Sequence, residues 1–208
     1  MKRKLTYDNL ITIIFLVILL VTLIYNLIFQ DGNKIARILL AIAATIVTKI
    51  FFSITFLKKS KASYVASILF IILSMYFGNI INFYEIIPNY DKILHLGSGI
   101  IIGFVGIVIY AYFTKGEINK INPMFMVFFS IMFTIALAGA WEIWEFTTDQ
   151  LFGLDSQLNS LIDTMTDIIC GTVGGGVALI PIYRFAKGKE NRFLKTIINE
   201  VSEDNQDK

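Results

Sequence analysis

The chain has 208 residues, of which 56% are hydrophobic and only 16% are charged. A soluble domain has about 45–50% apolar and about 25% charged residues, so this composition excludes an ordinary soluble protein. The formal net charge of +2 at pH 7 is too small to indicate nucleic-acid binding, and a single cysteine, Cys170, excludes an internal disulfide. We therefore interpret the chain as an integral membrane protein.

Six stretches are apolar for long enough to cross a bilayer, because a spanning helix needs about 20 mostly apolar residues. They cover about 9–29, 35–57, 64–83, 93–114, 124–145 and 161–183. The sequence thus predicts an all-α membrane protein, a bundle of about six transmembrane helices that forms one domain over residues 1–184. Residues 185–208 are predicted to form a polar cytoplasmic tail, with a short surface helix over 192–201.

The basic residues predict the orientation of the spans, because cytoplasmic segments carry an excess of Lys and Arg. With the N-terminus inside, the outer loops hold only Lys34, Arg37 and Lys92. The inner segments then hold Lys2, Arg3, Lys4, Lys58, Lys59, Lys61, Lys115, Lys120, Arg184, Lys187, Lys189, Arg192 and Lys195. We therefore predict that both termini are cytoplasmic. Within the second span, Lys49 is interpreted as snorkelling to the inner face rather than as neutralising a buried acid.

Three spans carry polar and small residues in line on one helix face, since residues four apart share a face. In the fourth span these residues are Asp91, His95, Gly99 and Gly103. In the fifth span, which runs the opposite way, they are Thr134, Ala138, Glu142, Glu145 and Asp149. In the sixth span they are Asp163, Asp167, Gly171 and Gly175. Small residues let membrane helices approach closely, so we expect these three faces to pack together.

The direction of each span brings the polar ends of these faces to one membrane surface. The fourth and sixth spans enter from outside and the fifth leaves there, which predicts a polar layer at the extracytoplasmic face. Its candidate ligands for a divalent metal ion are Asp91, His95, Glu142, Glu145, Asp163 and Asp167. Only Lys92 and His95 are nearby cations, so either several carboxyl groups are protonated or a cation lies among them. The pattern leaves open which of Glu142, Glu145 and Asp149 faces this layer.

Three motifs on successive spans resemble a known family. They are D-K-x-x-H from Asp91, W-E-x-x-E from Trp141 and D-x-x-x-D from Asp163, followed by glycines. In this order, over about residues 79–180, they resemble the YjdF-like family of bacterial multi-pass membrane proteins. The resemblance implies a bacterial cytoplasmic-membrane location and an outward-facing polar motif set, and it implies no biochemical activity. A looser resemblance to VanZ-like proteins rests on the same D-K-x-x-H opening and the late Asp pair. That resemblance implies Gln near Glu145 and Asn near position 167, and Phe146 and Asp167 depart from this pattern.

Three functions remain open. We favour a module that binds or senses an envelope or lipid ligand, or a cation. The alternative is a metal-assisted hydrolase or transferase acting on a lipid-linked substrate, because His and carboxylates suit a divalent ion that polarises a phosphate. His95 and Glu145 are then the catalytic candidates, although the cluster holds no second His and no Arg. A proton- or ion-coupled transporter is least favoured, since no polar track crosses the spans. The bilayer is the predicted partner, and the oligomeric state stays open.

Overall fold

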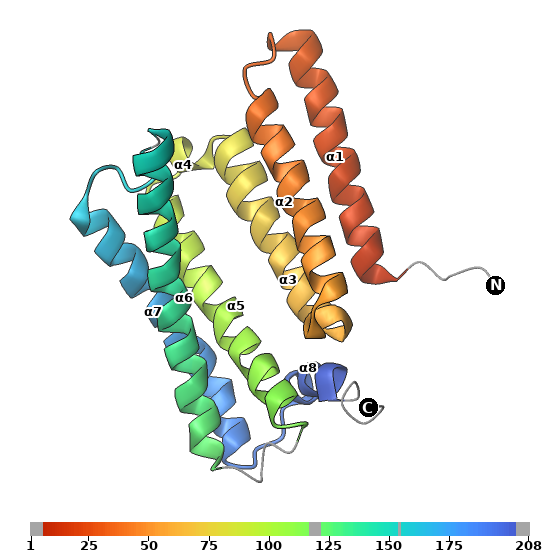
Figure 1. Ribbon diagram of the computed structural model, residues 1–208, viewed down its shortest axis with the longest axis vertical. Helices are drawn as coiled ribbons and strands as arrows, with labels where there is room; N and C mark the ends of the chain where they lie inside the picture. The colour runs from red at the N-terminus through yellow and green to blue at the C-terminus, as the bar shows by residue number, and fades with distance from the viewer. Residues whose placement is uncertain (1–5, 117–121, 154, 203–208) are drawn as a thin grey trace, which may run out of the picture. The chain divides into compact units, whose positions relative to one another are not determined.

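The structure, a computed structural model, describes residues 6–116, 122–153 and 155–202 (Figure 1). Every regular element within these ranges is a helix, and six helices are long and apolar enough to cross a membrane, which confirms the predicted fold class. These helices are α1 (Tyr7–Phe29), α2 (Ile35–Ile54), α3 (Lys61–Ile71) continued by η2 (Ile72–Ile80), α5 (Tyr90–Phe113), α6 (Pro123–Phe152) and α7 (Leu161–Ala186). Shorter helices are η1 (Phe56–Lys59), α4 (Phe83–Ile86) and α8 (Arg192–Ser202).

Local sequence signals fix the ends of the helices that later carry the site. At the start of α6 the Asn122 side chain accepts a hydrogen bond from the Met124 amide, and Pro123 occupies the first helical position. The helix continues past residue 145, where the predicted span stopped, because it meets no breaker before Gly153. Gly153 has φ 66°, a left-handed conformation that glycine adopts readily at helix ends. At the start of α7 the Ser160 hydroxyl caps the Asp163 amide.

The chain divides into two compact units, unit 1 (Met1–Tyr90) and unit 2 (Asp91–Lys208). In unit 1, the helices α1, α2 and α3–η2 pack around buried apolar residues that include Phe15, Leu19, Ile38 and Ile68. Aromatic rings meet edge to face inside this unit, with centroids 5.3 Å apart for Phe52 and Tyr64 and 6.2 Å apart for Phe15 and Tyr76. Such pairs stabilise beyond the area they bury. Unit 1 is therefore held mainly by interlocking large side chains.

One polar contact in unit 1 corrects the interpretation of Lys49. Its ammonium lies 3.5 Å from Asp8 Oδ2, 2.7 Å from Asn9 Oδ1 and 4.5 Å from the centre of the Tyr64 ring. Asp8 is buried near the start of α1, and α2 brings Lys49 to the same end of the unit. Lys49 therefore pairs with the Asp8 carboxylate in a partly solvated ion pair, which is the alternative to the predicted snorkelling.

Unit 2 is held differently, by close approach of helix backbones. A Cβ atom added at Gly99 of α5 would overlap the carbonyl oxygen of Gly171 in α7, and one added at Gly174 would overlap the carbonyl oxygen of Leu96. At Gly175 it would lie 2.7 Å from the Thr134 methyl group of α6. These contacts confirm that the small-residue faces pack together. Membrane helices associate through such packing because lipid supplies no hydrophobic drive between them.

Helix α8 belongs to unit 2 and coincides with the short helix expected in the tail. Its apolar residues Leu194, Ile197, Ile198 and Val201 are buried. The Phe193 ring meets the Phe104 ring of α5 edge to face, with centroids 5.2 Å apart. The tail is thus anchored on the helices of its own unit by this contact.

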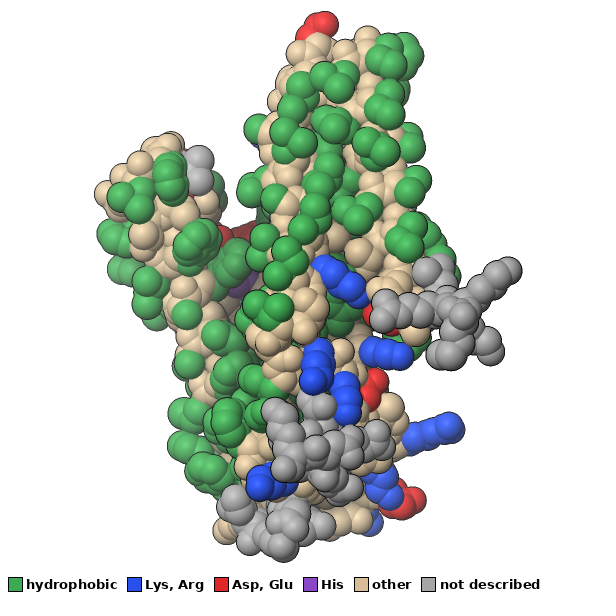
Figure 2. Space-filling model, turned by 45° about the vertical axis from the view of Figure 1, so that its right-hand side comes forward, with side chains coloured by type: hydrophobic (Ala, Val, Ile, Leu, Met, Phe, Trp, Pro, Cys, Tyr) green, Lys and Arg blue, Asp and Glu red, His purple; other side chains and the backbone are tan. Residues whose placement is uncertain are grey.

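The surface of the long helices is apolar. Figure 2 shows hydrophobic side chains over most of the visible helix surface. Many apolar side chains of the long helices, such as Ile13, Val17 and Val21 of α1, are about half exposed. A continuous apolar exterior suits helices that are surrounded by lipid. Among the residues used to predict orientation, Lys2, Arg3, Lys4 and Lys120 lie outside the described residues, as does the tail beyond 202.

Candidate cation site

Three helices of unit 2 bring their polar ends together. Asp91 and His95 lie four residues apart in the first turns of α5, and Asp163 and Asp167 do the same in α7. Glu142 lies late in α6, which runs antiparallel to both. The glycine contacts fix how each helix is rotated about its axis, because Gly99 and Gly171 follow His95 and Asp167 by one turn on the same faces. The polar residues above them therefore face one another.

The centre of the cluster is the Nε2 atom of His95. It lies 3.7 Å from Asp91 Oδ1, 3.9 Å from Asp167 Oδ1 and 4.0 Å from Glu142 Oε1. None of these oxygens is close enough to His95 for a hydrogen bond. Ligands that share one metal ion at about 2.0–2.2 Å lie about 3–4.4 Å from one another. Asp91, His95 and Asp167 each offer one ligand atom within 4.8 Å of the others. The spacing therefore matches a set of atoms around a single small cation.

The ligand atoms are buried and incompletely satisfied. The exposed fraction is 3% for Glu142, 1% for Asp167 and 8% for His95. Glu142 Oε1 and Asp167 Oδ1 are fully buried, and neither accepts a hydrogen bond. A buried acceptor without a partner costs about 1–3 kcal/mol, and more when it is charged. Asp167 Oδ1 has the Lys92 ammonium 2.7 Å away, whereas Glu142 Oε1 faces only His95 and requires a compensating positive charge or proton.

Lys92 supplies part of that charge. Its ammonium donates to Asp163 Oδ1 at 2.5 Å and to Asp167 Oδ2 at 2.8 Å. It also lies 2.7 Å from Asp167 Oδ1, at an angle that makes no hydrogen bond, and 3.7 Å from Asp91 Oδ2. Lys92 thus contacts the carboxylates of Asp91, Asp163 and Asp167, and Glu142 adds a fourth carboxylate to the cluster. The cluster stays short of positive charge even when His95 is protonated.

The three acids of α6 have separate roles in the structure. Glu142 faces His95, as described above. Glu145 accepts a hydrogen bond from the Trp141 indole at 2.8 Å, four residues earlier on the same helix. Asp149 accepts the backbone amides of Ser156 and Gln157, both at 3.0 Å, and so shapes the connection between α6 and α7. Of the six ligands expected from sequence, the structure gathers Asp91, His95, Glu142 and Asp167. Asp163 is directed to Lys92, and Glu145 is directed to Trp141.

The comparisons with known proteins agree with this architecture. Residues 10–188 match the model of a family described as "Predicted membrane protein (DUF2238)". The chain belongs to this family. The DUF2238 chain is also 31% identical, over 112 residues, to an uncharacterised protein of Thermotoga maritima. That stretch covers 54% of the chain and 57% of the relative, so the chain spans little more than half of the relative's length. No solved structure matches.

These matches settle the class and leave the activity open. The DUF2238 description names a membrane protein without a function, and the Thermotoga relative is a bacterial protein that is also uncharacterised. The comparisons therefore confirm a family of membrane proteins without an assigned activity. The YjdF-like resemblance is compatible with this family. The VanZ-like resemblance gains no support from them.

Two residues of the candidate site were not among the expected ligands. Lys92 was counted only as a nearby cation, although it precedes His95 by three residues and so shares its helix face. Gln157 was missed because it lies in the connection between α6 and α7, where helical periodicity gives no signal. Its side-chain amide donates to Glu142 O at 3.1 Å and to Glu142 Oε2 at 3.2 Å. Gln157 thereby leaves Glu142 Oε1 as the oxygen that faces His95.

Proposed function

We propose that this membrane protein binds one divalent cation among Asp91, His95, Glu142 and Asp167. The observation that carries the proposal is the position of three carboxylate oxygens at 3.7–4.0 Å from His95 Nε2, too far for hydrogen bonds and suited to a shared ion. Those of Glu142 and Asp167 are buried, and that of Asp91 lies at the more exposed edge of the cluster. The excess of carboxylates over cations adds an electrostatic reason, since burying unpaired carboxylates is costly. Lys92 and Gln157 then act as outer partners that orient Asp167 and Glu142.

The ligand chemistry narrows the choice of ion. Imidazole nitrogen suits Zn²⁺ and other late transition ions, whereas carboxylate oxygens suit Mn²⁺, Mg²⁺ and Ca²⁺. A site with one imidazole and three carboxylates is therefore best matched by Mn²⁺ or Zn²⁺. Mg²⁺ is the weakest candidate, because it prefers an all-oxygen octahedron in which it keeps several waters.

Cation binding fits the arrangement better than metal-assisted hydrolysis. Of the two catalytic candidates, His95 lies among the ligands, and one oxygen of Glu145 is bonded to Trp141 on the outside of α6. A general base has to reach the water that it activates, and among the described residues no hydrogen bond or ion pair joins Glu145 to His95 or to the Asp91 and Asp167 ligands. The proposed role is thus binding or sensing of the cation, or of a ligand that the cation holds, in the cell membrane.

Metal binding to the full-length protein in detergent tests this proposal. After purification without chelators, metal content and titration calorimetry with Mn²⁺ and Zn²⁺ should give about one ion per chain. His95→Ala and Asp167→Asn should each weaken binding by at least about 100-fold, since loss of even an outer-shell partner costs 10–100-fold. Asp155→Asn is the matched control, because this acid is exposed, its side chain accepts a hydrogen bond from Asn159 and it lies outside the cluster. Absence of binding in wild type, or full binding by both site variants, would refute the proposal.

We further propose that the site faces the extracytoplasmic side, on the basis of the positive-inside distribution of Lys and Arg. A cytoplasm-dependent reporter fused after Lys208 should then be active, because α6 leaves the cytoplasm and α7 returns to it. A reporter that works only outside the cytoplasm should be inactive at the same position. The reverse pattern would place the cation site on the cytoplasmic side without affecting the proposal that it binds a cation.

A further inference from the structure

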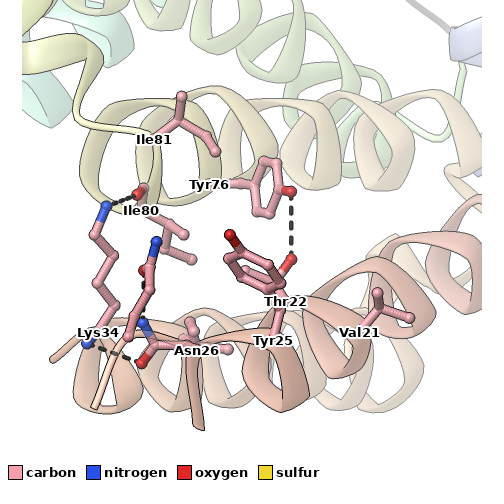
Figure 3. A pocket seen from close by; sticks show the side chains of 10 residues that line it. Val21, Thr22, Tyr25, Asn26, Lys34, Tyr76, Ile80 and Ile81 are labelled. Atoms are coloured by element: carbon pink, nitrogen blue, oxygen red, sulfur yellow. Dashed lines mark hydrogen bonds between the residues drawn. The ribbon is translucent and has the colours of Figure 1, made fainter. Parts of the chain in front are cut away.

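Unit 1 contains a cavity of about 300 Å³ at the end where α1 finishes, α2 begins and η2 finishes (Figure 3). Val21, Ile38 and Ile80 give it an apolar wall, and Lys34 gives it a cation. Every residue that lines it belongs to unit 1, so the cavity is separate from the cation site in unit 2.

The position of the cavity along the helices places it at the depth of lipid headgroups. Helix α1 has 23 residues and is therefore about 34 Å long, close to the roughly 30 Å thickness of the hydrocarbon core. The cavity is lined by residues from the last turns of α1, including Tyr25, which is 53% exposed. Tyrosine at such a position is typical of the boundary between hydrocarbon and headgroups. A phospholipid therefore presents its phosphate and glycerol at this level.

Two basic residues at this end of unit 1 can attract an anion, next to a turn that also holds Asp31. Lys34 and Arg37 lie at the start of α2, where the helix dipole disfavours cations. The first turn of α2 holds no acidic residue that would offset this effect. The Lys34 ammonium donates to Ile80 O at 2.6 Å, and Arg37 donates to Asn79 O at 3.0 Å. An ammonium has three N–H groups, so Lys34 retains donors for a further acceptor. Within the described part of unit 1, no ion pair joins either residue to a carboxylate.

The cation is held in place by a buried side chain. Asn26 is 1% exposed, and its Oδ1 accepts the Lys34 backbone amide at 3.1 Å. Its Nδ2 donates to Gln30 Oε1 at 2.9 Å and to Asn33 Oδ1 at 3.0 Å, so both amide hydrogens of Asn26 are used. Figure 3 shows Asn26 beside Lys34 at this end of the cavity. This network fixes the turn between α1 and α2 and sets Lys34 at the rim of the cavity. A preorganised cation loses little conformational freedom when it binds a ligand.

We infer that the cavity binds the headgroup of an anionic phospholipid. Its phosphate pairs with Lys34, and its glycerol and first methylenes lie against Val21, Ile38 and Ile80. The inference is independent of the proposed cation site, because it rests on other residues in the other unit.

Lipid titration followed by native mass spectrometry of the full-length, delipidated protein tests the charge requirement. Phosphatidylglycerol should bind more tightly than phosphatidylcholine with the same acyl chains. Lys34→Gln should weaken phosphatidylglycerol binding about fivefold, the factor that one basic side chain contributes near an anionic membrane surface. Lys34→Arg, which keeps the charge, should bind like wild type, and Lys189→Gln should be unchanged. Equal binding of the two lipids, or wild-type binding by Lys34→Gln, would overturn the inference.

A second pair of variants tests the cavity without altering charge. Val21→Trp should fill the space and abolish the preference for phosphatidylglycerol, because Val21 lines the cavity and is 60% exposed. Val47→Trp is the control, since Val47 is 63% exposed on α2 and does not line it. Unchanged lipid preference in Val21→Trp would overturn the assignment to this cavity. Inorganic phosphate that binds as tightly as phosphatidylglycerol would show a site for the free anion instead of a lipid.

Discussion

In unit 1 the buried acid Asp8 has one cation, Lys49, whereas in unit 2 a single lysine, Lys92, lies against several carboxylates. Lys49 is 41% exposed and also contacts Asn9 and the Tyr64 ring, so the pair in unit 1 is balanced and partly solvated. The cluster in unit 2 is more deeply buried and keeps excess negative charge. A buried ion pair and a cation site can therefore be built from the same residue types. The number of positive and negative charges within contact distance distinguishes the two.

The two units also differ in how their helices are held. Aromatic rings meet in both units, whereas the helix backbones of unit 2 also touch at Gly99 and Gly174. Close backbone contact leaves each helix in unit 2 little freedom to rotate, and the ligand geometry depends on that rotation. Packing by glycine therefore suits a unit that has to hold charged groups in a fixed geometry.

Replacement of Lys92 in unit 2 and of Lys49 in unit 1 should show the largest difference between the two kinds of site. Without added metal, Lys92→Met should lower the free energy of unfolding by about 3–5 kcal/mol, because it leaves buried carboxylates unpaired. Lys49→Met should cost about 1 kcal/mol or less, because its pair is more exposed. Mn²⁺ or Zn²⁺ should raise the thermal midpoint of Lys92→Met in detergent and leave that of Lys49→Met unchanged. Equal responses to metal in the two variants would break the comparison.

A glycine pair in α7 sharpens the packing difference. Gly174→Ala should destabilise unit 2 by about 1–3 kcal/mol or more, because the new methyl group would overlap the Leu96 carbonyl. Gly176→Ala, two residues later on the same helix, should be neutral or slightly stabilising, since nothing lies within 4 Å of its added Cβ. Thermal unfolding in detergent measures both. Comparable losses in the two variants would contradict close backbone packing at Gly174.

Loss of the Gln157 amide should affect only the unit that binds the cation. Gln157→Ala removes two hydrogen bonds to Glu142 and should weaken Mn²⁺ or Zn²⁺ binding about tenfold, with about 1 kcal/mol of lost stability. Gln150→Ala, at an exposed position of α6, is the matched control. Calorimetric titration gives both affinities. Wild-type affinity in Gln157→Ala would remove this residue from the outer shell.

The smallest effect is expected in unit 1. Tyr64→Phe removes the 2.6 Å hydrogen bond between the Tyr64 and Thr12 hydroxyls and should cost about 1 kcal/mol or less. The affinity for divalent cations should not change, because Tyr64 lies in the other unit. Measurement of thermal midpoint and metal affinity on the same sample checks both parts. A change in metal affinity would show that the two units are coupled.

Much of the fold followed from the sequence because its causes are local. Long apolar runs predict the six helices, and a spacing of four places His95 above Gly99 and Asp167 above Gly171 on single helix faces. The same spacing predicted that these faces pack, and the close contact of Gly99 with Gly171 confirms it. These features can be predicted from sequence because they depend only on the helical period and on the size of the side chains.

The choice among acids on one helix required the tertiary structure. Glu142, Glu145 and Asp149 lie on a broad stripe of α6, and the contact of Thr134 with Gly175 selects the rotation that turns Glu142 toward His95. Gln157 reaches Glu142 only because Asp149 folds the following connection back. Sequence spacing specifies which residues share a face, but only packing between helices fixes the angle of that face, and the distances among charged atoms depend on that angle.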